Sequence, residues 1–462
     1  MKNLLSLLLL AALLAGCAPK TPQGASVTGL IDNLEKGAFV MGGPGGARDS
    51  VFLDETGHFI FEKPELTEPG TYYMIFGRDV IYLYLAPGMQ MDFYADMNTF
   101  AESKGFSGTG SDINNYMAGK NPRAFDYNWF ALSEEEFLFK ADSVLAEQQA
   151  AFVSVEKVDP DDAFWVKEEA ELLFGWANNL STYPSYHGYY AQVQDFKVSE
   201  SWYDFRNKLD VNNPAYVASP AFNQYVSTLV RSKAADKIKE IKEADSTAEV
   251  RTRMINLTVA SEVIEEQKVL NHFWYSSVTD AMQWEDLSGM QEEIDFFTAN
   301  CTDQEYIDKF NATWEEWKKL DKGAPMFDFE GKDLEGNTVK STDFRGKYLY
   351  VDVWATWCGP CIYEIPYLKE LEKDYHDRNI VFMSYSIDED HAAWLKFVPE
   401  NELGGVQIIG EKAWESQLCK DYKIRGVPTF MFFDPEGKII SAKMTRPSDK
   451  KTRDTFDSYN DL

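Results

Sequence analysis

Two cysteines separated by two residues, Cys358 and Cys361, stand in the segment VDVWATWCGPC at positions 351–361. The segment begins as an apolar run and has Pro360 just after the first cysteine, which predicts a strand followed at once by a helix. The unpaired N–H groups of a helix N-terminus stabilise a thiolate over a thiol, so the pKa of Cys358 is expected to be lowered. The spacing therefore predicts a redox pair in which Cys358 is the exposed nucleophile and Cys361, one turn deeper, resolves the mixed disulfide.

A metal site and a structural staple are the alternatives for this pair. A tetrahedral zinc site needs four ligands, whereas the chain has one such pair and five histidines that are scattered without ligand spacing. A disulfide that closes so small a loop removes little entropy from the unfolded chain. Both alternatives are therefore disfavoured, and neither a metal nor a bound organic cofactor is expected.

Two acids stand close to the pair in sequence. Asp352 lies six residues before Cys358, inside the apolar run YLYVDV. Burial in a strand covered on both faces should raise the pKa of this carboxyl group and make it a proton acceptor, unless it reaches solvent at the strand end. Glu364 lies three residues after Cys361, so on a helix its side chain leans back over the cysteine turn, although an ordinary exposed helical acid would have the same spacing.

The rest of the chain must position these residues, and its pattern changes twice. Residues 27–116 alternate apolar and polar residues in short runs, which predicts a small antiparallel sandwich with a hairpin loop at 54–57. Residues 117–320 have apolar residues at helical spacing and a capping box at 133–136. Residues 323–462 alternate strands and helices, which predicts an α/β domain with a mixed sheet and helices on both faces. The expected fold is multidomain: all-β, then α-helical, then α/β.

The first residues have the pattern of a targeting segment. Lys2 precedes an apolar run that is too short to span a membrane as a mature helix. The run ends in LAGC, which resembles the lipobox of bacterial lipoproteins, and the resemblance implies lipid attachment at Cys17. Residues 1–17 are thus predicted to be a lipoprotein signal peptide with its lipobox cysteine, and residues 18–26 a linker. A plain secretory signal with an incidental cysteine is the alternative.

The net charge limits the classes of partner that the protein can bind, and the remaining cysteines can be assigned in the same way. The formal net charge of −30 repels phosphate backbones, so nucleic acid is not expected as a partner. Of the five cysteines, Cys301 and Cys419 lie outside the lipobox and the redox pair. They are expected to be inert buried thiols, and a disulfide between them is the alternative.

The C-terminal motifs together resemble a known family. WCGPC with a following GVPT is similar to the thioredoxin fold, and the lead-in GAPMFDFEGKDLEGNTVKSTDFRGKYLYV is similar to the TlpA/ResA-type membrane-anchored thiol-disulfide oxidoreductases. Residues 27–116 resemble the β-domain that precedes a thioredoxin fold in many bacterial lipoproteins. One departure concerns the lysine that accompanies the buried aspartate in thioredoxins, because Ser384 stands at that position here.

The resemblance implies a set of site residues. Pro428 would be a cis-proline facing the cysteine pair, and Val427 would offer its backbone to an extended partner segment. Trp357 would add a flat apolar face beside the nucleophile. The full prediction is a catalytic group of Cys358, Cys361, Asp352 and Glu364, and a substrate-binding group of Trp357, Gly359, Pro360, Val427 and Pro428.

These features predict a lipid-anchored, extracytoplasmic thiol-disulfide oxidoreductase that faces the periplasm and acts on disulfides of other proteins. The resemblance implies a reductase that draws electrons from a transmembrane thiol carrier and serves cytochrome c maturation or the repair of wrong disulfides. An oxidase or isomerase is the first alternative, because the surroundings of the sulfur atoms set the reduction potential. The second alternative is a binding lipoprotein with a vestigial thioredoxin fold.

Overall fold

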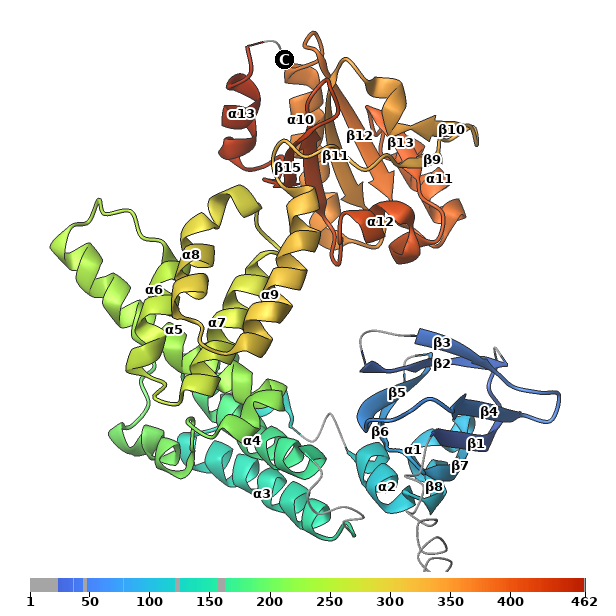
Figure 1. The fold of residues 1–462 in the computed structure, drawn as a ribbon, viewed down its shortest axis with the longest axis vertical. Helices are drawn as coiled ribbons and strands as arrows, with labels where there is room; N and C mark the ends of the chain where they lie inside the picture. Colours follow the sequence, from blue (N-terminus) through green and yellow to red (C-terminus); the bar gives the residue numbers. More distant parts are fainter. Residues whose placement is uncertain are drawn as a thin grey trace, which may run out of the picture. The chain divides into compact units, whose positions relative to one another are not determined.

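The computed structural model describes residues 24–462 except 36, 45–47, 78, 121–124, 157–162 and 461 (Figure 1). The predicted signal peptide, including Cys17, lies outside the described residues. The described chain divides into two compact units, the first reaching Leu209 and including Ala218–Tyr225, the second formed by Asp210–Val217 and Val226–Leu462. Among the described residues, no helix is both long and apolar enough to cross a membrane.

Two four-stranded sheets form the N-terminal part of the first unit, with strand orders β4-β1-β7-β8 and β3-β2-β5-β6. Apolar side chains on alternate strand positions fill the space between them, and Phe39 packs against Phe59 and Phe76 with ring centroids 4.9 Å apart in each pair. The strands are β1 (Ala25–Asp32), β2 (Ala38–Gly42), β3 (Arg48–Phe52), β4 (His58–Lys63), β5 (Gly70–Phe76), β6 (Asp79–Leu85), β7 (Gln90–Asp96) and β8 (Gly105–Thr109).

Two details of this sandwich correct the prediction. β1 and β7 run parallel, with Ser26 opposite Gln90, so the sandwich is not wholly antiparallel. Residues 54–57 do form a tight turn, in which the Asp54 amide donates to the His58 carbonyl at 2.8 Å. However, β3 pairs with β2 and β4 pairs with β1, so the turn joins two sheets and is not a hairpin loop. Strand pairing depends on which distant strand offers a matching buried face, and local turn residues do not encode that choice.

Helices follow the sandwich, as predicted. Ser133 and Glu136 form the expected capping box at the start of α3. Aromatic side chains fill the interior of this region, where Phe137 and Tyr183 are buried with ring centroids 4.4 Å apart. The helices before the α/β domain are α1 (Phe100–Ser103), α2 (Ser111–Gly119), α3 (Glu134–Val153), α4 (Ala163–Tyr190), α5 (Pro220–Ala244), α6 (Thr252–Val259), α7 (Gln267–Ala281), α8 (Gln291–Asn300) and α9 (Gln304–Trp317).

A seven-stranded mixed sheet of order β10-β9-β13-β12-β11-β14-β15 forms the C-terminal domain. The central strand β11 is buried along its whole length, parallel to β12 and antiparallel to β14. α10 and α13 cover one sheet face, where Tyr350, Leu371 and Phe456 share one apolar cluster. The elements are β9 (Glu330–Lys332), β10 (Thr338–Lys340), β11 (Tyr348–Trp354), α10 (Gly359–Asp374), β12 (Ile380–Ser386), α11 (His391–Glu400), β13 (Val406–Ile409), α12 (Gln417–Asp421), β14 (Thr429–Phe433), β15 (Ile439–Met444) and α13 (Lys450–Asp457).

Candidate active site

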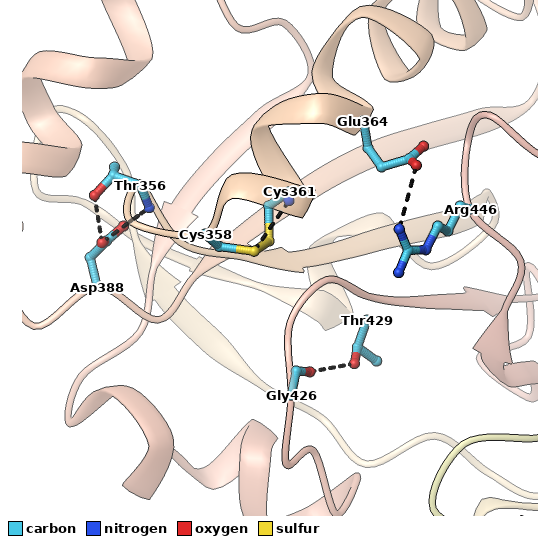
Figure 2. Close-up of a disulfide and its surroundings, with 8 residues drawn as sticks. All are labelled: Thr356, Cys358, Cys361, Glu364, Asp388, Gly426, Thr429 and Arg446. Atoms are coloured by element: carbon cyan, nitrogen blue, oxygen red, sulfur yellow. Dashed lines mark hydrogen bonds and ion pairs between the residues drawn. A yellow bond between two sulfur atoms is a disulfide. The ribbon is translucent and has the colours of Figure 1, made fainter. Parts of the chain in front are cut away.

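Cys358 and Cys361 form a disulfide at the N-terminus of α10 (Figure 2). Cys358 is the N-cap of the helix, and its sulfur accepts a hydrogen bond from the backbone N–H of Cys361 at 3.2 Å. Gly359 and Pro360 form the first turn, where a proline sacrifices no hydrogen bond. The predicted arrangement of a strand, a cysteine at the helix start and a second cysteine one turn later is therefore present.

The exposure of the cysteines differs from the prediction. Cys358 was expected to be the exposed member, but Cys358 and Cys361 are each only 4% exposed. In the disulfide each sulfur covers part of the other, and the sulfur of Cys358 is further occupied by the amide of Cys361. A partner must therefore approach Cys358 through the residues around it, which gives those residues a direct influence on reactivity.

Asp352 lies inside β11 and is 8% exposed, so the alternative that it reaches solvent is wrong. Side chains alternate along a strand, which puts Asp352 on the same sheet face as Tyr350, the face that α10 covers. Its Oδ1 accepts no hydrogen bond from any residue that the structure describes. Desolvation, followed by the charges of Glu364 and Glu372, raises the pKa of Asp352 to about 8.

Ser384, which stands where thioredoxins carry a lysine, lies directly opposite Asp352 on β12. A serine supplies no positive charge there, whereas a lysine would favour the ionised carboxylate. Because desolvation and neighbouring acids act on it without a compensating positive charge, the Asp352 carboxyl group has a pKa of about 8 and can exchange a proton near neutral pH.

Glu364 is 3% exposed, which rules out the ordinary exposed helical acid. Its Oε2 accepts the backbone N–H of Ser448 at 3.0 Å and its Oε1 accepts the hydroxyl of Ser448 at 2.9 Å. The Arg446 guanidinium lies 3.8 Å from Oε1, and Figure 2 marks this ion pair with a dashed line. The segment between β15 and α13 thus fixes this carboxylate beside the cysteine turn.

The loop between β11 and α10 is anchored by Asp388, which follows β12 and is 1% exposed. Its carboxylate accepts the backbone N–H of Thr356 at 3.0 and 3.1 Å and the hydroxyl of Thr356 at 2.7 Å (Figure 2). The hydroxyl of Ser386 donates a further bond at 2.7 Å. Because Thr356 stands two residues before Cys358, these hydrogen bonds fix the loop that leads to the nucleophilic cysteine.

The Val427–Pro428 peptide is cis, as the sequence predicted. The turn that contains it is closed by the Thr429 hydroxyl, which donates to the Gly426 carbonyl at 2.8 Å in the surroundings of the disulfide (Figure 2). Trp357 on the opposite loop is 59% exposed, with its ring 6.3 Å from that of Trp414. Beside Trp357 lies a pocket of about 500 Å3 lined by Thr356, Trp357, Ile387, Asp388, Glu389, Asp390, Ala393 and Trp414.

The two remaining described cysteines take no part in this site. Cys301 and Cys419 are free and buried, so the alternative of a disulfide between them is wrong. Burial raises the pKa of both thiols, which makes them poor nucleophiles. Within the described part of the chain, no three His, Cys, Asp or Glu side chains are grouped so that they could hold a metal ion.

Four residues that support the site, Arg446, Ser448, Asp388 and Thr356, were not predicted from the sequence. Arg446 and Ser448 reach Glu364 from more than 80 residues away, and no local pattern marks them. Asp388 and Thr356 did leave a signal, because an acid directly after a predicted buried strand and a threonine in the preceding loop are suited to capping.

Comparison with known proteins agrees with the geometry. The Redoxin family model matches residues 319–461. The thiol-disulfide oxidoreductase ResA of Bacillus thuringiensis subsp. konkukian is 33% identical over 128 residues, 28% of this chain and 71% of that protein. ResA of Bacillus cereus is 32% identical over 126 residues, 27% of this chain and 70% of that protein.

Among solved structures, the thioredoxin domain of a thiol-disulfide oxidoreductase from Bacteroides vulgatus is 31% identical to this chain, with a TM-score of 0.28. The match covers 30% of this chain and 97% of that domain. The family assignment rests on the ResA relatives, which match over more than two thirds of their length. Through its C-terminal domain, the chain belongs to the TlpA/ResA-like thiol-disulfide oxidoreductases of the thioredoxin fold.

Proposed function

We propose that this oxidoreductase works as a protein disulfide reductase, tethered to a bacterial membrane through Cys17 and facing the periplasm. In the proposed reaction the Cys358 thiolate attacks a disulfide of a partner protein, and one partner thiolate leaves. Asp352 accepts the proton of Cys361, whose thiolate then attacks the sulfur of Cys358. The second partner thiol leaves, the partner disulfide is reduced, and Cys358 and Cys361 end as a disulfide.

The observation that carries this proposal is the buried pair of acids on the α10 side of the sheet. Asp352 and Glu364 are 8% and 3% exposed, and desolvation, followed by the charge of Glu364, raises the pKa of Asp352. Negative charge in a dry site disfavours thiolates, and a less stabilised dithiol form makes the couple a stronger reductant. An oxidase would need the reverse, a strongly stabilised reduced form.

The reduction cycle needs a source of electrons, and we propose a transmembrane thiol carrier that reduces the Cys358–Cys361 disulfide. Electrons then pass only between sulfur atoms, so the reaction calls for no metal or organic cofactor. Disulfide-bearing extracytoplasmic proteins are the substrate class, with cytochrome c maturation and the repair of wrong disulfides as candidate processes.

Equilibration of the Cys358–Cys361 couple in dithiothreitol and glutathione buffers tests the direction of the reaction. A reductase requires a reduction potential near that of thioredoxin, about −270 mV, while a value near −120 mV, that of DsbA, would make the protein an oxidant. Cys361→Ser should accumulate mixed disulfides through Cys358, and Cys358→Ser should accumulate none. Cys419→Ser is the matched control, because that thiol is free and buried. Unchanged partner capture by Cys358→Ser would instead support a binding lipoprotein.

The tether is tested separately with Cys17→Ser. The variant should move from the membrane fraction to the soluble extracytoplasmic fraction and lose incorporation of radiolabelled fatty acid. Continued membrane association without the label would contradict the lipid anchor and leave the redox proposal intact.

A further inference from the structure

The helical region places an aromatic side chain against the cis-proline turn of the α/β domain, within the same compact unit. Trp284 follows α7 and is 68% exposed. Its ring lies beside Gly426, because a Cβ built on Gly426 would be 3.5 and 3.6 Å from two ring carbons. Gly426 directly precedes the cis Val427–Pro428 peptide. The ring therefore borders the backbone to which an extended partner segment is expected to bind.

Two acidic residues, Glu285 and Asp286, hold the turn that carries Trp284. The Asp286 carboxylate accepts the hydroxyl of Ser441 on β15 at 2.5 Å, and it also accepts backbone N–H groups of Ala442 and Lys443. Glu285 forms an ion pair with Arg253 on α6. Because the turn is held in this way, its backbone loses little conformational freedom when the exposed ring makes a contact, which favours binding.

Exposed apolar side chains also flank the cysteine pair from α10 and its preceding loop. Trp357 and Tyr363 are 59% and 62% exposed, and Ile362 is 40% exposed. Aromatic residues at this density on a surface are typical of the centre of a protein-binding site, where they pack on side chains and backbone of the partner. Trp284 adds an exposed ring on the cis-proline side, beside Gly426.

We propose that Trp284 is a specificity-determining residue, which packs against the residues flanking the reactive cysteine of an extended partner polypeptide. The proposal rests on the thiol-disulfide exchange described above and adds the helical region to its substrate site. It identifies the occupant as a polypeptide, because a small disulfide that offers only its sulfur atoms and their immediate substituents has no flanking residues for the ring to contact.

Two disulfide probes with one leaving group test the proposal. The first is an octapeptide whose central cysteine is bonded to thionitrobenzoate, and the second is dithiobis(nitrobenzoate), so both release the same coloured thiolate as the reduced protein is oxidised. Trp284→Ala should lower the second-order rate constant with the peptide about 10-fold, equivalent to about 1.4 kcal/mol, and leave that with the small disulfide unchanged. Trp284→Phe should retain most of the peptide rate. Phe139→Ala is the control, since Phe139 on α3 is 70% exposed in the other unit.

Asp286→Ala provides a second variant that leaves the ring intact. Release of the turn should produce the same selective loss of the peptide rate, with an unchanged reduction potential. Equal peptide rates in wild type and Trp284→Ala, or an equal loss with both probes, would overturn the specificity role. A wild-type protein that reacts with neither probe would overturn the oxidoreductase function itself, so the two failures are distinguishable.

Discussion

Glu364 on α10 and Ser448 before α13 are joined by two hydrogen bonds across 84 residues of sequence. Both carboxylate oxygens of Glu364 have a partner in Ser448, and the Arg446 guanidinium lies 3.8 Å from one of them. These contacts supply the hydrogen bonds that a carboxyl group needs when it is only 3% exposed. The charge of Glu364 contributes, after desolvation, to the raised pKa of Asp352.

Removal of this charge should shift the pH dependence of the enzyme. Glu364→Gln lowers the pKa of Asp352 below its value of about 8, because one of the charges that opposes ionisation is lost. The rate at which Cys361 resolves a mixed disulfide should then rise at a lower pH than in wild type. Stopped-flow measurement between pH 5 and 10 would give the midpoint, with the exposed Glu370→Gln on the same helix as control. A midpoint unmoved in Glu364→Gln would contradict the coupling.

Asp352→Asn should slow the resolution step itself. The amide has the shape of the carboxyl group but cannot take up the proton of Cys361, and loss of a general base typically costs about 10²- to 10⁴-fold in rate. The first attack by Cys358 should change much less. Separate measurement of mixed-disulfide formation and decay distinguishes the two steps, and an equal loss in both would assign Asp352 a role in the fold only.

The same substitution should change stability in a pH-dependent way. Since the folded-state pKa of Asp352, about 8, lies above the ordinary value of 3.8, the folded protein holds a proton that the unfolded chain releases between these two values. Wild-type stability from this group therefore falls as pH rises from about 4 to about 8, by about 1.4 kcal/mol for each unit of pKa difference.

Asp352→Asn carries no such pH-dependent cost. At pH 4 the free energy of unfolding of the variant should be equal to or slightly lower than that of wild type. At pH 9 it should be a few kcal/mol higher, and urea denaturation at the two pH values measures both. Asp377→Asn, whose side chain is 86% exposed, should show no comparable trend. A constant difference across the pH range would argue that Asp352 is already ionised in the fold.

Asp388 should contribute strongly to stability through the Thr356 loop. Asp388→Ala leaves the backbone N–H of Thr356 without its carboxylate acceptor in a half-buried position, so the free energy of unfolding should fall by about 3 kcal/mol. Asp390→Ala is the comparison, because Asp390 caps the neighbouring helix α11 from an exposed position and should cost about 1 kcal/mol. Equal losses in chemical denaturation would contradict the anchoring role.

The cysteines should differ in their reactivity toward an alkylating agent. Mild reduction followed by iodoacetamide and peptide mass spectrometry should label Cys358 in the folded protein, while Cys301 and Cys419 should require denaturant because they are buried and their pKa values are raised. Labelling of Cys419 without denaturant would show that α12 opens locally.

The sequence was most informative where the determining interactions are local. The strand, the cysteine turn and the helix after it follow from an apolar run, Pro360 and helical spacing, and all three are present. The burial of Asp352 was also predictable, since its neighbours in β11 are all apolar. These features depend on residues within about one element of each other.

Interactions between distant segments were not predictable in the same way. The parallel pairing of β1 with β7 and the bonds from Ser448 to Glu364 depend on which segments the fold brings together, and neither partner carries a local mark of the other. The low exposure of Cys358 likewise results from the disulfide and its surroundings and not from residue type. In the sequence, nothing distinguished Trp284 from the other aromatic residues of the helical region.

The edge strand β15 has a consequence for the behaviour of the chain in a crowded compartment. The backbone of residues 323–326 forms hydrogen bonds with the backbone of Gly437 and Ile439. Further along the strand, the Asp286 carboxylate accepts hydrogen bonds from the backbone N–H groups of Ala442 and Lys443. At the opposite border the sheet ends in β10, a strand of three residues that includes Lys340. Short, charged or covered borders prevent a sheet from adding strands of other molecules. An oxidoreductase with such borders can therefore react with another polypeptide through its sulfur atoms without adding that polypeptide to its sheet.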